Sequence, residues 1–188
     1  YHYFREMYSN YPIAESNQIA YAITEDSNAG FQFFSHALKG SKLISAGENS
    51  NVLSCLEQTT SGDILAIVDG AAFGAMIESC LEYINIQANQ RITLWMPESF
   101  EYFILQSGIL PSKELEDILA SPWNYVEAKE FESWERFFTQ LLISLAKNTP
   151  FQYSKQTLNP SYLQDKIVRK IAAEFPAAIK CRMESGQD

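Results

Sequence analysis

The stretch Ile64-Leu65-Ala66-Ile67-Val68-Asp69-Gly70 decides the fold, because five successive apolar residues are followed by an acid and a glycine. A short run that is apolar at every position is typical of a strand buried on both faces of a parallel sheet. Asp and Gly are turn residues. We therefore predict a strand over Ile64–Val68, a turn at Asp69-Gly70 and a helix over Ala71–Ile84.

The same strand–turn–helix order is repeated on both sides of this run. The predicted strands cover residues 19–24, 42–45, 64–68 and 91–96, and the helices that follow them cover 30–38, 51–58, 71–84 and 98–106. Strands joined through helices pair in parallel with right-handed crossovers. We expect an α/β fold with an open, mainly parallel sheet between two layers of helices, as in Rossmann-like proteins.

The two ends of the chain break this alternation. Residues 1–18 show no clear period and predict an irregular or edge-strand lead-in, whereas helices are predicted over 112–119, 133–147 and 161–175. A chain of 188 residues suits one domain with an appendage. We expect an α/β core over residues 1–110 and a helical extension over 111–188, packed as one compact unit, with the acidic stretch Glu127–Glu135 as a hinge.

Charge is distributed unevenly along the chain. Residues 1–138 contain 7 Lys or Arg against 19 Asp or Glu, a net −12, whereas residues 139–188 contain 7 against 4, a net +3. Two interpretations of the basic end stay open, a solvated helix face and a surface that contacts phosphate. On the second interpretation, nucleic acid or a nucleotide binds the basic carboxyl-terminal helices.

The composition predicts a cytoplasmic protein without a membrane segment. The longest apolar runs are far shorter than the roughly 18–20 residues that span a bilayer. The amino terminus lacks the basic and apolar regions of a secretory signal. Three widely spaced cysteines in apolar contexts are typical of reduced thiols rather than of disulfides or a metal site.

Acidic and amide side chains follow the predicted strands. In an open parallel sheet these loops meet at the carboxyl edge, where ligands bind. The candidate metal ligands are Glu25, Asp26, Asp69 and Glu98. The candidate ligand-binding residues are Gly47, Asn49, Asn51, Gly70 and Glu101. Converging carboxylates are tolerated when a cation such as Mg²⁺ neutralises them; alternatively, the same residues cap helices and turns without a metal.

Three segments in this half resemble the toprim domain. The run Ala22-Ile23-Thr24-Glu25-Asp26-Ser27-Asn28 resembles the first toprim motif, a strand that ends in Glu and leads into a helix. Residues 44–53 are similar to the glycine-containing segment of the toprim domains in overcoming-lysogenization-defect nucleases, and Ile67–Ala71 lies where toprim domains place an Asp-x-Asp pair. The resemblance covers residues 19–100 and implies that Glu25 and Asp69 hold Mg²⁺ and catalyse phosphoryl transfer.

The chain departs from this family at two positions. Asp26 replaces the usual Gly after the Glu, and Ala71 replaces the second Asp of the pair. The loss of that carboxylate argues against a two-metal nuclease. Either Asp26, Glu98 or Glu101 substitutes for the missing ligand, or the domain is a degenerate relative that binds without cutting.

A lysine in the predicted extension is the candidate partner of the acidic edge. Phe151-Gln152-Tyr153-Ser154-Lys155 places an aromatic ring, hydroxyls and an ammonium beside a helix cap, and is either an ordered loop or part of a site. We take Lys155 as the first candidate for a catalytic or phosphate-binding role. Lys166, Arg169 and Lys170 are further candidates.

Three functions follow from these observations. The first is a toprim-like, Mg²⁺-dependent phosphoryl-transfer or nucleic-acid-processing domain. The second is a non-catalytic nucleotide-sensing or protein-interaction module, which could form a homo-oligomer. The third is a sugar-nucleotide-dependent transferase, because such enzymes share strand-end acids and parallel sheets. The sequence lacks the motifs of a nucleotide-binding P-loop and of a histidine-based triad, which argues against both chemistries.

Overall fold

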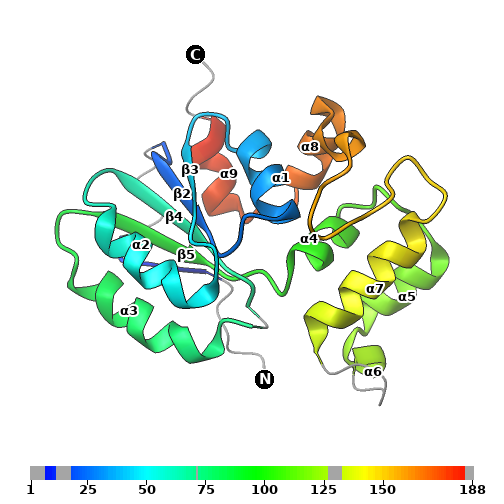
Figure 1. Ribbon diagram of the computed structural model, residues 1–188, viewed down its shortest axis with the longest axis horizontal. Coiled ribbons are helices and arrows are strands. Elements are labelled where there is room, and N and C mark those ends of the chain that lie inside the picture. The colour runs from blue at the N-terminus through cyan, green and yellow to red at the C-terminus, as the bar shows by residue number, and fades with distance from the viewer. Residues whose placement is uncertain (1–6, 12–17, 71, 127–132, 185–188) are drawn as a thin grey trace.

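The computed structural model describes residues 7–11, 18–70, 72–126 and 133–184 and is built around one five-stranded sheet (Figure 1). The strands are β1 (Met7–Ser9), β2 (Tyr21–Thr24), β3 (Lys42–Ser45), β4 (Asp63–Ile67) and β5 (Arg91–Trp95). Their order is β1-β5-β4-β2-β3, with β2 to β5 parallel and β1 antiparallel to β5. The predicted open, mainly parallel sheet is confirmed, and the lead-in contributes an edge strand.

Helices cover both faces of this sheet. In the α/β half they are α1 (Ala29–Ala37), α2 (Val52–Gln58), α3 (Ile77–Ile86) and α4 (Phe100–Gln106), with short 3₁₀ turns η1 (Asn49–Asn51) and η2 (Gly74–Met76). The remaining helices are α5 (Lys113–Ala120), α6 (Trp123–Val126), α7 (Trp134–Ala146), η3 (Pro160–Leu163), α8 (Asp165–Ala172) and α9 (Ala177–Glu184). In Figure 1, α2 and α3 cover one face, and α1 and α9 cover the other. Within the described ranges, none of these helices is long and apolar enough to cross a membrane.

Strand β4 shows why the four residues that follow Asp63 are all apolar. Ile64 and Ala66 belong to the hydrophobic cluster under α2 and α3, whereas Leu65 and Ile67 belong to the cluster on the opposite face. Successive side chains of a strand point to opposite faces, so a central strand covered on both sides needs apolar residues at every position. All five residues of β4 are buried.

The helix predicted over Ala71–Ile84 begins later than expected. Asp69 accepts backbone hydrogen bonds from the N–H groups of Ala72 and Phe73 at 3.1 and 2.9 Å, which closes a turn after β4. Phe73 is fully buried in the cluster under α3. Because this turn places Phe73 in the core, the α-helix starts only at Ile77.

Two other predicted helix boundaries were wrong for local reasons. The helix predicted from Glu98 starts at Phe100, because the Ser99 side chain accepts the Tyr102 N–H at 3.1 Å and caps the helix. The helix predicted over 161–175 is divided, because Gln164 is extended between η3 and α8. Pro176 then separates α8 from α9, which the sequence did not predict.

The extension shares its core with the sheet. Helix α4 contacts α7, and α8 contacts α1. An aromatic group joins the two parts, since the ring centroid of Phe175 lies 5.0 Å from that of Trp95 and 5.3 Å from that of Phe103. The boundary predicted at residue 110 therefore lies between α4 and α5 and is crossed by one hydrophobic cluster.

Candidate functional site

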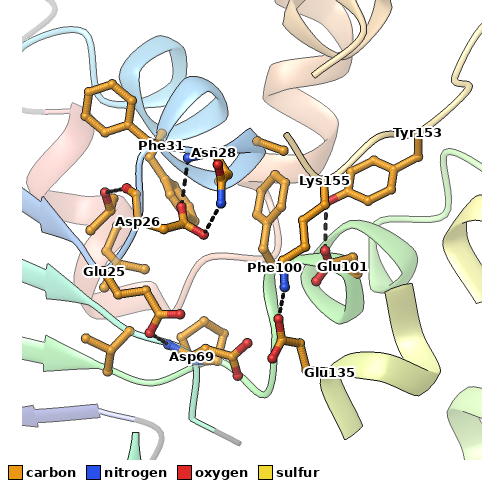
Figure 2. A pocket seen from close by; sticks show the side chains of 17 residues that line it. Glu25, Asp26, Asn28, Phe31, Asp69, Phe100, Glu101, Glu135, Tyr153 and Lys155 are labelled. Atoms are coloured by element: carbon orange, nitrogen blue, oxygen red, sulfur yellow. Dashed lines mark hydrogen bonds and ion pairs between the residues drawn. The ribbon is translucent and has the colours of Figure 1, made fainter. Parts of the chain in front are cut away.

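A pocket opens at the carboxyl edge of the sheet, between β2 and β4. The chain leaves β2 for β3 on one side and later forms β4 on the other side, so this is the switch point at which open α/β sheets bind ligands. The pocket has a volume of about 60 Å³ and is lined by the ends of β2 and β4, the starts of α1, α4 and α7, and the loop that carries Lys155 (Figure 2).

Glu25 lies at the base of this pocket, directly after β2. Its Oε2 accepts a hydrogen bond from the backbone N–H of Asp69 at 2.9 Å, which joins the ends of β2 and β4 (Figure 2). Burial raises the pKa of the Glu25 carboxyl above its ordinary value, and the nearby Asp26 carboxylate adds to this rise. The hydrogen bond from the Asp69 N–H and the positive charge of Lys155 lower the pKa of Glu25 and offset part of this rise.

Asp26 lines the same pocket and also organises the turn into α1. Its Oδ1 accepts the Asn28 N–H at 3.0 Å, and its Oδ2 lies 3.3 Å from the Asn28 Nδ2. The Thr24 hydroxyl donates to the Asp26 carbonyl at 2.8 Å. Asp26 therefore closes the turn before Asn28, the residue at which α1 is capped, and both of its carboxylate oxygens already accept hydrogen bonds from Asn28.

Lys155 comes from the extension but is held against the start of α1. Its backbone carbonyl accepts the Ala29 N–H at 3.0 Å. The Gln32 side chain holds the same loop twice, donating to the Gln156 carbonyl at 3.1 Å and accepting the Leu158 N–H at 2.9 Å. The Lys155 ammonium forms an ion pair with Glu135 at the start of α7 (Figure 2).

A buried hydrogen bond supports the opposite wall of the pocket. The Tyr153 hydroxyl donates to Oε1 of Glu101 at 2.7 Å, and both residues are buried. Burial, together with the negative charge of Glu101, raises the pKa of the Tyr153 hydroxyl well above its ordinary value. The Tyr153 hydroxyl is therefore the donor in this hydrogen bond, and Glu101 is the acceptor.

The structure brings together half of the predicted site residues. The pocket is lined by Glu25, Asp26, Asp69, Glu101 and Lys155. The predicted residues that are not among its lining are Gly47, Asn49, Asn51, Gly70 and Glu98. The position of Ala71, where toprim domains carry a second Asp, lies outside the described residues, as does most of the predicted hinge Glu127–Glu135.

Three of the predicted residues outside the pocket, Gly47, Asn51 and Gly70, have local structural roles. In the loop after β3, Gly47 has φ +85°, and Asn51 donates from its side chain to the Ala46 carbonyl at 3.1 Å. Gly70 lies where β4 and β5 end, and its N–H donates to the Pro97 carbonyl at 2.7 Å. A Cβ at Gly70 would lie 3.0 Å from the Met96 and Pro97 oxygens, so this close approach requires glycine.

Sequence reasoning missed Glu135 as a pocket residue. Glu135 follows the α7 cap residue Ser133, where an acid is expected for the helix dipole alone. Its pairing with Lys155 depends on how α7 and the following loop are placed in space. Tyr153, by contrast, belongs to the segment Phe151–Lys155, in which the sequence had indicated Lys155 as a candidate.

The pocket fits a metal ion only if water and the phosphate of a ligand complete its coordination. Among the described residues, no group of three or more His, Cys, Asp or Glu side chains is arranged to hold a metal. A cage made by the protein alone therefore does not fit. Mg²⁺, however, is commonly held by one or two carboxylates together with water and the phosphate of a ligand, and the acidic lining fits that arrangement.

Comparison of the chain with protein-family models, with curated proteins and with solved structures finds no match.

Proposed function

We propose that the carboxyl-edge pocket binds a phosphate group together with Mg²⁺ and supports phosphoryl transfer, in the class of toprim-like nucleic-acid-processing domains. The observation that carries this proposal is the charge of the described lining. Five carboxylates, from Glu25, Asp26, Asp69, Glu101 and Glu135, surround a single ammonium, that of Lys155.

This balance of charge sets the condition for binding. A phosphate alone would be repelled by the carboxylates, because like charges that are poorly solvated interact strongly. A cation that enters with the phosphate neutralises both. Burial is the main cause of the raised pKa of Glu25, and a cation bound beside this carboxyl would favour its charged form.

Different pocket residues would then bind the cation and the phosphate. Glu25 and Asp69 face the switch point and would hold the cation, which supplies charge neutralisation and orientation of the phosphoryl group. Lys155 would leave Glu135 and donate to the phosphate, as a mobile ammonium can. Gln32 and the Ala29 N–H fix the backbone of the Lys155 loop, so only its side chain has to move.

One observation favours a non-catalytic alternative, a phosphate- or nucleotide-sensing module. One oxygen of Glu25 and both oxygens of Asp26 already accept hydrogen bonds from the protein. Fewer lone pairs are then available for a cation than a two-metal reaction needs. The sugar-nucleotide transferase stays a prediction without added support.

The decisive test is metal-dependent cleavage. The full chain is incubated with labelled single- and double-stranded DNA and RNA, with Mg²⁺ or Mn²⁺ and with chelator. We expect cleavage only with metal, and its loss in both Lys155→Met and Glu25→Gln.

Lys147→Met is the matched control, because Lys147 is an exposed lysine at the end of α7 and is not among the pocket lining. Cleavage that persists in Lys155→Met would contradict the proposal. Metal-dependent binding of phosphate without any cleavage would favour the sensing alternative.

A further inference from the structure

A second and larger hollow lies at the opposite, amino edge of the sheet. Its volume is about 700 Å³, and it is formed by the segments that precede β2 and β3 together with α8 and α9. Helix α1 separates it from the carboxyl-edge pocket, since Ala29 lines the pocket and Ala37 lines this hollow. We call it the amino-edge groove. Its charged lining residues are Lys39, Asp165, Arg169, Lys180 and Arg182.

The groove is basic in an acidic protein. Its lining has four cationic side chains and one carboxylate, a formal +3, and Asp63 beside Arg182 lowers this to +2, whereas the whole chain carries −9. The carboxyl-terminal ends of α1 and α8 also reach the groove, and each contributes roughly −0.5 of an elementary charge. With Asp63 counted beside Arg182, about +1 therefore remains after these two helix dipoles are neutralised, and Lys39, Arg169 and Lys180 carry it.

The contacts of Lys180 and Lys39 leave the charge of these two side chains largely in place. Lys180 donates to the Ala173 carbonyl at 3.0 Å, which is a neutral acceptor. The Lys39 ammonium pairs with the Asp165 carboxylate at 3.3 Å, and their side chains are 68% and 72% exposed. An exposed pair of this kind is worth about 0–1 kcal/mol, so an incoming anion can displace Asp165 from Lys39.

Arg182 gives the groove a rigid cationic wall. It is buried, and its Nη1 donates to the Thr93 hydroxyl of β5 at 2.8 Å. Its Nη2 lies 4.0 Å from Oδ2 of Asp63 at the start of β4. This guanidinium therefore has a fixed place in the sheet, whereas Lys39 and Arg169 are exposed and can move onto a ligand.

Size and composition narrow the ligand class. A volume of about 700 Å³ lies within the 300–1,000 Å³ that is common for small-molecule sites, and is too small for a nucleic-acid duplex. Single strands are bound largely by stacking on aromatic rings. No Phe, Tyr or Trp is among the described residues that line the groove. Charge without stacking surfaces suits a compact anion with several phosphates.

We propose that the amino-edge groove binds a small oligophosphate through Lys39, Arg169 and Lys180, without a metal ion. This site is separate from the carboxyl-edge pocket and does not rest on the function proposed for it. Phosphates spaced along one short chain would reach cations from α1, α8 and α9 at once.

The test is titration calorimetry of the full chain with tripolyphosphate, at low ionic strength and with EDTA. We expect binding with one site, weakened at least tenfold in the double variant Arg169→Gln/Lys180→Gln. Asp165→Asn should tighten binding several-fold, because it removes the carboxylate from the mouth of the groove. Lys113→Gln, an exposed lysine of α5 outside the groove, should bind like the wild type.

Lys155→Met separates this proposal from the function proposed above, and should leave metal-free binding unchanged. The proposal is overturned if the wild type shows no binding, if Lys113→Gln weakens binding as much as the double variant, or if Lys155→Met abolishes it. Tighter binding of a single-stranded oligonucleotide than of tripolyphosphate, dependent on the same residues, would assign the groove to nucleic acid instead. Melting curves of each variant verify that it is folded.

Discussion

Glu25 links stability to pH, because its pKa is raised by burial in the folded chain. The folded protein then binds this proton more tightly than the unfolded chain does. The stabilisation is complete below the ordinary value of 4.5 and is lost as the pH rises through the raised pKa. Glu25→Gln cannot ionise but keeps an acceptor for the Asp69 N–H.

We therefore expect Glu25→Gln to be more stable than the wild type near pH 8, with a difference that shrinks toward pH 4. Urea unfolding across this range measures the free energy of unfolding of both proteins. Glu82→Gln, an exposed glutamate within α3, is the control and should show little change. A wild type that is the more stable protein near pH 8 would show that the carboxylate is stabilised by its surroundings.

Tyr153 is expected to stabilise the fold through its hydrogen bond to Glu101. Tyr153→Phe removes a donor from the buried Glu101 carboxylate and should cost about 1–3 kcal/mol of unfolding free energy. Adding Glu101→Gln should recover part of this loss, because a neutral amide needs the donor less. Urea unfolding of the two single variants and the double variant measures the coupling.

Tyr162→Phe is the matched control for that cycle. The Tyr162 hydroxyl donates at 2.6 Å to the Phe151 carbonyl, which is neutral, so its loss should cost less, about 0.5–1.5 kcal/mol. Strictly additive effects of Tyr153→Phe and Glu101→Gln would show that the two side chains do not depend on each other.

At the scale of elements, the contact between the loops after β4 and β5 can be tested at one glycine. A methyl group at Gly70 would lie 3.0 Å from two backbone oxygens, so Gly70→Ala should destabilise the fold by about 1–3 kcal/mol. Gly74 is the internal control, because a Cβ there meets nothing within 4 Å. Gly74→Ala should be neutral or stabilise by up to about 1 kcal/mol. Equal effects in thermal unfolding would contradict the close approach at Gly70.

The central strand β4 could be predicted because its burial on both faces requires a continuous apolar run in the sequence. The later start of α3 could not be predicted, because it depends on Phe73 packing into a core built by distant segments. Helix α6 has four residues and α9 follows a proline, so neither offers a long periodic pattern.

The candidate site divides in the same way. Glu25, Asp26 and Asp69 could be placed at one edge because each follows a predicted parallel strand, and the carboxyl ends of parallel strands meet at one edge of the sheet. The pairing of Lys155 with Glu135 spans 20 residues and depends on the packing of α7. The loop residues Asn49 and Asn51 follow β3, an edge strand, and this position next to β2 only became known with the strand order.

The whole molecule presents opposite charges at the two edges of its sheet. Among the described residues, the charged lining of the carboxyl-edge pocket consists of five carboxylates and one lysine, whereas that of the amino-edge groove consists of four cations and one carboxylate. Phosphate should therefore require a metal ion at the first edge and none at the second. This difference separates the two sites in a single preparation of the protein.

The most direct test of the central claim is the binding of Mg²⁺ by titration calorimetry, with and without saturating inorganic phosphate. The account predicts that Mg²⁺ binds at the carboxyl-edge pocket only when phosphate is present. Binding should be roughly 10- to 100-fold weaker in Lys155→Met, the loss expected for a charged hydrogen bond, and unchanged in Lys147→Met. Equal binding of Mg²⁺ without phosphate, or in Lys155→Met, would contradict it.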